Sequence, residues 1–193
     1  MRLSVKFPKI ALISPLIVLM TLTGCGGGNS IAEKYNLGEG PDLDTSNSLM
    51  GTDENKNGIR DDIENYLINT YRDPAQRKAT LQYAKSVQHA IMVQVPDKPL
   101  DKKPKKKDRS EIAEEDQVLK SESKKAVLEV SRGAVCIYDK FYDSKIPTSG
   151  VIIEITSLTA NTNARKQAYK RTNKLAREIT SFVTDSNSCD LQV

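Results

Sequence analysis

The stretch from Asp53 to Glu64 constrains this 193-residue chain more than any other, because its oxygen-bearing side chains recur at fixed intervals around a glycine. With Asp53 as position 1, such side chains fall at positions 1, 3, 5, 9 and 12, and Gly58 occupies position 6. Ca²⁺ is a hard cation that binds about six to eight oxygen atoms, so a chain must wrap around it to supply them. The wrap needs a sharp turn, which glycine makes at no steric cost because it readily adopts a positive φ. The spacing therefore predicts a calcium site.

The predicted calcium ligands combine side-chain oxygens with one main-chain carbonyl. They are the side chains of Asp53, Asn55, Asn57, Asp61 and Glu64, together with the carbonyl oxygen of Ile59. A donor set of three carboxylates and two amides predicts a modest affinity, which suits a structural ion better than a cytosolic switch. The competing interpretation is an Asn-Gly turn followed by an acidic helix N-terminus, since both patterns are also favourable without a metal.

The loop resembles the EF-hand-like loops of the Asp-x-Asn-x-Asn-Gly type found in many secreted and surface bacterial proteins. Its second half, from Asn57 to Glu64, is similar to a run that recurs in uncharacterised bacterial envelope lipoproteins. This resemblance covers the loop and the helix after it, and it implies metal binding by the matching positions. Two departures stand out. Arg60 occupies position 8, where an apolar residue usually pairs with a second loop, and the glycine- and proline-containing segment before Asp53 predicts no entering helix. We therefore expect a solitary loop.

Residues 1–24 have the features of a secretory signal peptide: a positive start followed by a short apolar run over 10–21. The run is shorter than a typical membrane span. It ends in Leu22-Thr23-Gly24-Cys25, which resembles the lipobox of bacterial lipoproteins and implies that Cys25 is acylated and becomes the first residue of the mature chain. The alternative is an ordinary signal peptide with an incidental cysteine. By resemblance to enteric-type lipoproteins, Gly26 after the cysteine implies the outer membrane, facing the periplasm.

The remaining chain is predicted to divide into a flexible tether over 25–48, rich in Gly, Asn, Ser and Asp, and a helical domain over 49–193. The net charge is +4, and three of the positive charges lie in the signal peptide, at Arg2, Lys6 and Lys9. The mature chain is therefore nearly neutral, which gives no indication of nucleic-acid binding. Cys136 and Cys189 remain as a pair, and in an exported protein we expect them to form a disulfide. Two free thiols or a bond to another chain are the alternatives.

Apolar residues at helical spacing predict a small all-α bundle of four to five helices. The expected helices cover residues 60–71, 74–95, 110–142, 151–158 and about 161–183, with a turn over 146–150. Asp73 and Pro74 are placed to begin the second helix as N-cap and first helical residue. Gly133 marks a position where another helix can approach closely. Residues 151–158 are β-branched, so a strand is the alternative there, but no partner strand is evident elsewhere.

Two groups of basic residues have alternative interpretations. The Lys-rich stretch 97–109 predicts a solvated, mobile loop, and attraction to anionic lipid is the alternative. The last helix carries six cations, which we place on its outer face: Arg165, Lys166, Lys170, Arg171, Lys174 and Arg177. Such a face is usually solvated, and an acidic protein partner is the alternative.

The composition argues against catalysis. His89 is the single histidine, tryptophan is absent, and neither a Gly-x-Ser-x-Gly elbow nor a zinc-binding motif occurs. We therefore expect no enzyme but a membrane-anchored binding or structural module whose cofactor is Ca²⁺. An inhibitor or immunity-type lipoprotein is the alternative, and a periplasmic hydrolase is a more distant one. The oligomeric state is left open by the residues.

Overall fold

The computed structural model describes residues 34–35, 40–93, 95, 109–178 and 188–189, and within these ranges it contains helices and no strand. The helices are α2 (Asp61–Thr70), α3 (Pro74–Met92), α4 (Arg109–Lys140), α5 (Thr148–Thr159) and α6 (Asn163–Leu175), with a 3-10 turn, η1 (Ala176–Glu178), after α6. The prediction of a small all-α bundle is thereby confirmed. None of the described helices combines the length and the apolar character that crossing a membrane requires.

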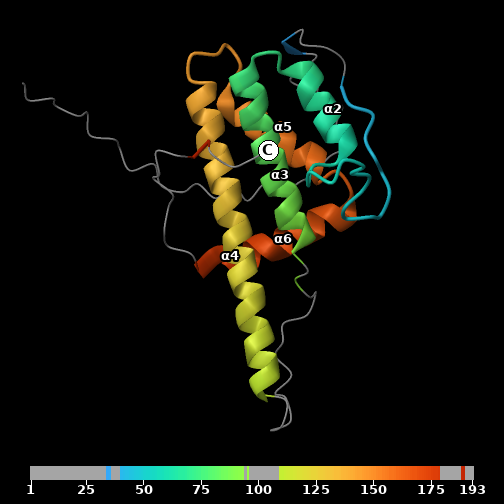
Figure 1. The fold of residues 1–193 in the computed structure, drawn as a ribbon, viewed down its shortest axis with the longest axis vertical. Coiled ribbons are helices and arrows are strands. Elements are labelled where there is room, and N and C mark those ends of the chain that lie inside the picture. Colours follow the sequence, from blue (N-terminus) through green and yellow to red (C-terminus); the bar gives the residue numbers. More distant parts are fainter. Residues whose placement is uncertain (1–33, 36–39, 94, 96–108, 179–187, 190–193) are drawn as a thin grey trace, which may run out of the picture.

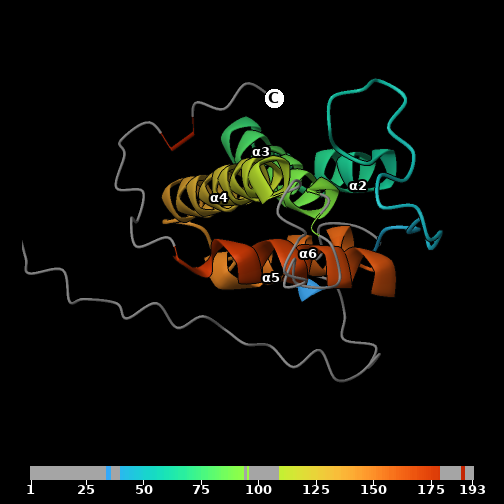
Figure 2. The same cartoon turned by 90° about the horizontal axis from the view of Figure 1, so that it is seen from below.

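The helices form two layers around α3. Helices α2, α3 and α4 lie side by side in one layer, and α5 and α6 pack across them as the second (Figures 1 and 2). Helix α3 contacts all four of the other α-helices, and its most extensive contact is with α4. The first part of α4 extends beyond the rest of the bundle (Figure 1). Helix α3 is therefore the central element on which the other four α-helices pack.

The core lies where the two layers meet, and its largest contributors are fully buried aliphatic and aromatic side chains. They include Ile63 and Leu67 of α2, Val87 and Ile91 of α3, Ile137 and Phe141 of α4, and Val151 and Ile155 of α5. The predicted close approach at Gly133 is confirmed, because a Cβ there would lie 3.0 Å from the Tyr83 Cα. A larger residue would therefore force α3 and α4 apart.

Local sequence signals account for most helix boundaries. The Asp73 side chain caps α3 by accepting from the main-chain N–H groups of Ala75 and Gln76, at 3.0 and 2.9 Å. Thr162 caps α6 by accepting from the Arg165 N–H at 3.3 Å. Helices α3 and α4 end two to three residues earlier than predicted, and α6 passes into a 3-10 turn after Leu175. The start of α5 also differs from the prediction. Residues 148–150, expected to be part of a turn, form the first turn of α5, because Pro147 is extended (φ −68°, ψ 124°) and starts the helix directly after itself.

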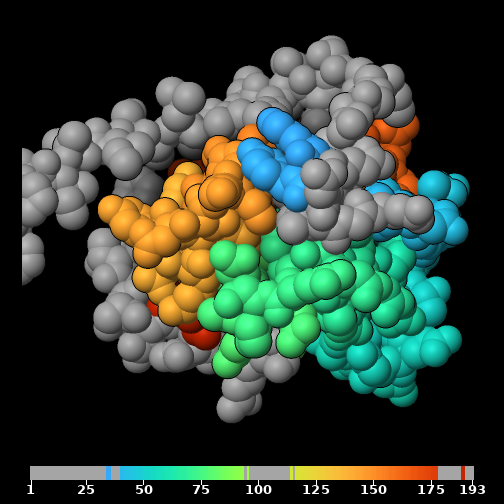
Figure 3. Space-filling view, turned by 90° about the horizontal axis from the view of Figure 1, so that it is seen from above, coloured from blue at the N-terminus to red at the C-terminus, as the bar shows by residue number. Residues whose placement is uncertain are grey.

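The described residues before the loop are held against the bundle. Leu43 and Leu49 pack on the core, and the Gln88 side chain donates to the main-chain oxygens of Leu49 and Met50, at 3.0 and 3.3 Å. The packed part of the chain therefore begins several residues before the boundary at 49 that the composition predicts. Seen from above, this segment (blue to cyan) runs along one side of the molecule and continues into α2 (Figure 3).

A disulfide joins Cys136 of α4 to Cys189, with a Cα–Cα distance of 5.0 Å, as predicted from the cysteine count. A hydrogen bond of 2.6 Å from the Gln82 side chain to the Ser188 carbonyl lies next to it and ties the same segment to α3. Several predicted features lie outside the described residues. They are the predicted signal peptide, the predicted lipobox with Cys25, most of the predicted tether, the Lys-rich stretch up to residue 108 and the helix predicted beyond residue 178.

Candidate functional site

The loop over 53–64 turns back on itself around Gly58, as the motif predicts. Two residues adopt left-handed conformations here, Lys56 with φ 57° and Gly58 with φ 86°. The turn directs main-chain N–H groups inward onto the first carboxylate: Asp53 Oδ1 accepts from the Asn57 N–H at 3.1 Å, and Oδ2 accepts from the Gly58 N–H at 3.0 Å. A carboxylate at position 1 thus organises the turn from inside the loop.

Glu64 closes the loop from the first turn of α2. Its Oε2 accepts from the Asn55 side-chain amide at 3.0 Å, and its Oε1 accepts from the Asn57 amide at 2.6 Å. The two amide oxygens are also engaged, since they accept from the main-chain N–H groups of Asn57 and Ile59 at 3.1 and 2.8 Å. Four of the five predicted side-chain ligands (Asp53, Asn55, Asn57 and Glu64) therefore belong to one connected group around the turn.

Asp61, the fifth predicted side-chain ligand, joins the two ends of the loop. Both of its carboxylate oxygens lie 3.3 Å from the Glu54 main-chain nitrogen, and its own N–H donates to the Thr52 carbonyl at 2.8 Å. The Ile59 side chain is buried in the core at 1% exposure, which anchors the loop to the bundle. A ligand role for the Ile59 carbonyl remains a prediction.

The chemistry of this donor set fits a hard cation. Among the described residues, no three His, Cys, Asp or Glu side chains come together as a metal site, so a cation bound here would also need amide and carbonyl oxygens. They are suited to do so, because each amide oxygen of Asn55 and Asn57 accepts one hydrogen bond and keeps a second lone pair. Both oxygens of Glu64 accept hydrogen bonds from the side-chain amides of Asn55 and Asn57, so a bound cation would take the place of these N–H donors.

Arg60, which departs from the motif at position 8, is buried at 1% exposure. Its guanidinium binds Asp62 in a bidentate manner, with Nε 2.6 Å from Oδ1 and Nη2 2.9 Å from Oδ2. It also donates to the carbonyls of Leu158 and Thr159, at 3.3 and 3.2 Å. These carbonyls are among the last of α5, where main-chain acceptors lack a partner within the helix and the helix dipole favours a cation. Arg60 thus connects the loop to the C-terminus of α5.

Arg165 of α6 was placed on the solvent face by the sequence pattern, and that prediction is wrong, because its side chain is fully buried. It donates to the Asp44 carbonyl at 2.5 Å and forms an ion pair with the Asp44 carboxylate at 3.1 Å. Asn161 lies between the two arginines: its Oδ1 accepts from Arg60 at 3.2 Å and from Arg165 at 2.8 Å. Asp44 in turn donates its main-chain N–H to Asp62 at 2.8 Å. We call Asp44, Arg60, Asp62, Asn161 and Arg165 together the arginine clasp.

The clasp places two positive and two negative charges together, so burial does not leave a net charge. The pKa of Asp44 lies below its ordinary value, chiefly because the Ser46 N–H donates to its carboxylate at 2.7 Å, and nearby Arg165 adds to the effect. Burial lowers the pKa of the Arg165 guanidinium, and the neighbouring Arg60 lowers it further, while Asp44 offsets part of the shift. The ion pair between Arg165 and Asp44 therefore depends on the Asp44 carboxylate being ionised.

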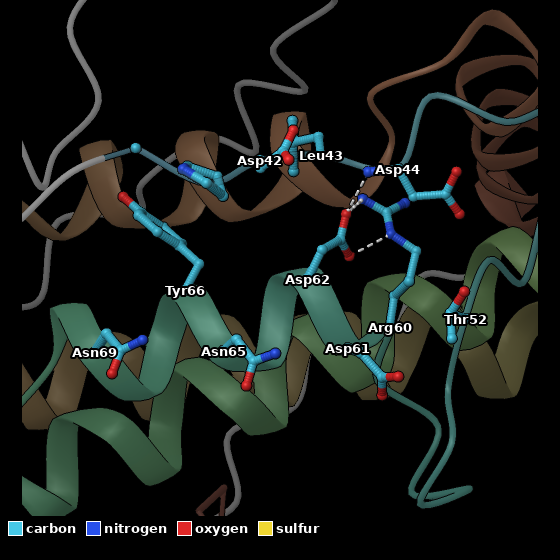
Figure 4. A pocket seen from close by; sticks show the side chains of 12 residues that line it. Asp42, Leu43, Asp44, Thr52, Arg60, Asp61, Asp62, Asn65, Tyr66 and Asn69 are labelled. Atoms are coloured by element: carbon cyan, nitrogen blue, oxygen red, sulfur yellow. Dashed lines mark hydrogen bonds and ion pairs between the residues drawn. The ribbon is translucent and has the colours of Figure 1, made fainter.

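A cleft of about 790 Å³ opens beside the clasp, between the segment 40–44 and α2. Figure 4 shows Asp62 extending from α2 toward Arg60 and the main chain at Asp44 at one end of it. Asp44 and Asp62 are paired with arginines, so the carboxylates at this end of the cleft stabilise the fold. A second cavity of about 420 Å³ lies on the other side of the loop, against α3.

His89 lies in the wall of that second cavity, and its side chain is 43% exposed. Its Nδ1 is 2.6 Å from Glu129 of α4. This contact links α3 to α4.

The arginine clasp is the part of the site that sequence reasoning missed. The pair Arg60 and Asp62 was visible two positions apart, but a charged residue in a helical pattern is ordinarily assigned to the surface. The signal that could have found it is the absence of an apolar residue at position 8. No protein-family model, no curated protein and no solved structure matches the chain.

Proposed function

We propose that this chain is a lipid-anchored protein of the bacterial cell envelope whose helical domain binds a structural Ca²⁺ in the loop 53–64. It acts as a non-catalytic binding or structural module. Acylation of Cys25 attaches it to the membrane, and residues 26 to about 39 separate the domain from the surface. The observation that carries the metal proposal is the inward position of Glu64, whose two oxygens converge with Asn55 and Asn57.

In this proposal Asp53, Asn55, Asn57 and Glu64 hold the cation, and Asp61 and the Ile59 carbonyl complete the set. The ion replaces amide N–H groups as the partner of Glu64 and so fixes the loop against α2. Because Arg60 and Asp62 come from the same stretch of chain, fixing the loop also fixes the clasp. The expected effect is stabilisation of the domain, with no change of fold.

Thermal unfolding of the protein with added Ca²⁺ tests the metal proposal. At a concentration about 100-fold above Kd, a ligand that binds only the folded state stabilises it by about 2.7 kcal/mol. For a domain of this size that corresponds to a rise in Tm of about 8 °C. Glu64→Gln should remove the rise. Mg²⁺ should give a much smaller one, because it is smaller and dehydrates reluctantly.

Glu54→Gln is the matched control, since Glu54 lies in the same loop, is exposed and has no predicted ligand role. It should keep the full response to Ca²⁺. An equal response in Glu64→Gln and Glu54→Gln would refute the calcium site. The anchor is tested separately: Cys25→Ser should release the protein from membrane fractions, and continued retention would refute acylation at that residue.

A further inference from the structure

Helix α6 and the turn after it carry a cationic face, which we define as Lys166, Lys170, Lys174 and Arg177. These residues are spaced by four, four and three positions, so they follow one side of the helix. The buried residues Ala168, Thr172 and Ala176 occupy the side that packs on α3 and α4. Lys170, Lys174 and Arg177 are exposed, and Lys166 is half-buried.

The charges of this face are not neutralised within the part of the chain that the structure describes. The four residues form no ion pair there, whereas Arg165 on the buried side pairs with Asp44. Helix α6 contains no acidic residue, in contrast to α4, where Lys120 pairs with Asp116 and Lys140 with Asp139. A run of uncompensated cations along one face is complementary to an extended anionic surface.

The position of the face in the fold matches the side from which the chain enters. Helices α5 and α6 form the layer opposite α2, α3 and α4, and the described segment 34–35 (blue) lies on the side of this layer, at the other end of the bundle from α6 (Figures 1 and 2). Residues 26–33 connect this point to Cys25. A membrane anchored through Cys25 is thus within reach of this layer.

We propose that the cationic face of α6 lies on the anionic phospholipid headgroups of the membrane and provides a second attachment beside the acyl chains. The proposal rests on the lipid anchor of the proposed function for its geometry. One anchor alone leaves the domain free to rotate on its tether, and a cationic face orients it. Each basic residue near an anionic bilayer raises the binding constant about fivefold at physiological ionic strength.

The experiment uses the mature chain, residues 25–193, with Cys25→Ser, so that both the apolar run of residues 10–21 and the acylation site are absent. It is mixed with vesicles of phosphatidylcholine with or without phosphatidylglycerol. Co-sedimentation measures the partition coefficient. Lys170→Gln combined with Lys174→Gln should lower binding to the phosphatidylglycerol vesicles about 25-fold, the product of two fivefold effects. Added salt should abolish the binding, because surface charges are screened. Arg72→Gln combined with Lys78→Gln is the control, since both residues are exposed near the start of α3.

Equal binding by the two double variants would overturn the proposal, and so would equal binding to vesicles with and without phosphatidylglycerol. Loss of binding to soluble polyglutamate, with vesicle binding unchanged, would assign the face to an acidic protein and would also overturn it. None of these results bears on acylation, which the membrane retention of the unmodified chain reports independently. Circular dichroism of each variant verifies that the helices are intact.

Discussion

Replacing Arg60 by methionine removes the guanidinium of the clasp while keeping a side chain of similar length. The substitution leaves Asp62, whose side chain is 14% exposed, without its bidentate partner, and leaves the Leu158 and Thr159 carbonyls without their donor. Breaking a buried ion pair by removing one member costs about 3–5 kcal/mol. Asp62 keeps hydrogen bonds from the N–H groups of Asp44 and Ile63, so we expect the lower part of that range, about 3 kcal/mol.

Chemical denaturation followed by circular dichroism measures this loss, which corresponds to a decrease in Tm of about 9 °C for a domain of this size. Arg72→Met, at an exposed arginine before α3, is the control and should change the free energy of unfolding by less than about 0.5 kcal/mol. Adding Asp62→Asn to Arg60→Met removes the unpaired charge but keeps an acceptor for the Asp44 N–H. The double variant should recover at least about 1 kcal/mol of the loss.

Two outcomes would refute this reasoning. If Arg60→Met costs no more than Arg72→Met, then the buried guanidinium contributes nothing that methionine cannot replace. If Asp62→Asn brings no recovery, then the unpaired carboxylate is not the origin of the cost, and the packing of the arginine stem against Gly51 must be considered instead.

Three further predictions concern other parts of the domain. Reducing the Cys136–Cys189 disulfide should lower the free energy of unfolding by about 4 kcal/mol in the loop-entropy model, and the double serine variant should show the same loss without responding to reductant. Burial raises the pKa of Tyr83 and Tyr169, so their contribution to the free energy of unfolding is complete below pH ~10 and is lost as the pH rises toward their folded pKa. Absorbance measured during alkaline titration should show these tyrosines ionising only when the protein unfolds. The pKa of Asp44 is lowered in the folded state, so its contribution to the free energy of unfolding is present above pH ~4 and is lost as the pH falls through the folded value. In Asp44→Asn, the free energy of unfolding measured by chemical denaturation should depend less on pH across that range.

Much of the fold follows from local signals, because helices are encoded by a spacing that can be counted along the chain. The cap at Asp73, the close approach at Gly133 and the pairing of the cysteines needed no knowledge of distant residues. The same holds for the turn at Gly58, where backbone sterics select glycine. The start of α5 was placed too late, because a proline before a helix is easily assigned to the preceding turn.

Burial of Arg165 could not be predicted in the same way, because its partner Asp44 is 121 positions away and belongs to a segment that composition assigns to a flexible tether. A helical wheel places a cation by its neighbours on the helix, and Lys166 and Lys170 do lie on the outer side. Whether a particular arginine turns inward depends on a carboxylate supplied by tertiary packing, and burial without one would be strongly unfavourable. Long-range charge pairing is therefore the information that single-sequence periodicity lacks.

The clasp shows what holds the loop over 53–64 to the described part of the bundle. An apolar residue at position 8 would need a partner loop to cover it, whereas Arg60 reaches the carbonyls at the end of α5 and the amide oxygen of Asn161. Those acceptors lie at the corner between α5 and α6, and Arg165 joins this corner to Asp44. The helical domain thus supplies the support that a paired loop would otherwise give. It follows that the conformation of the loop and the packing of α5 and α6 are coupled. A substitution at Arg60 should therefore loosen the packing of α6, and a substitution at Arg165 should loosen the loop.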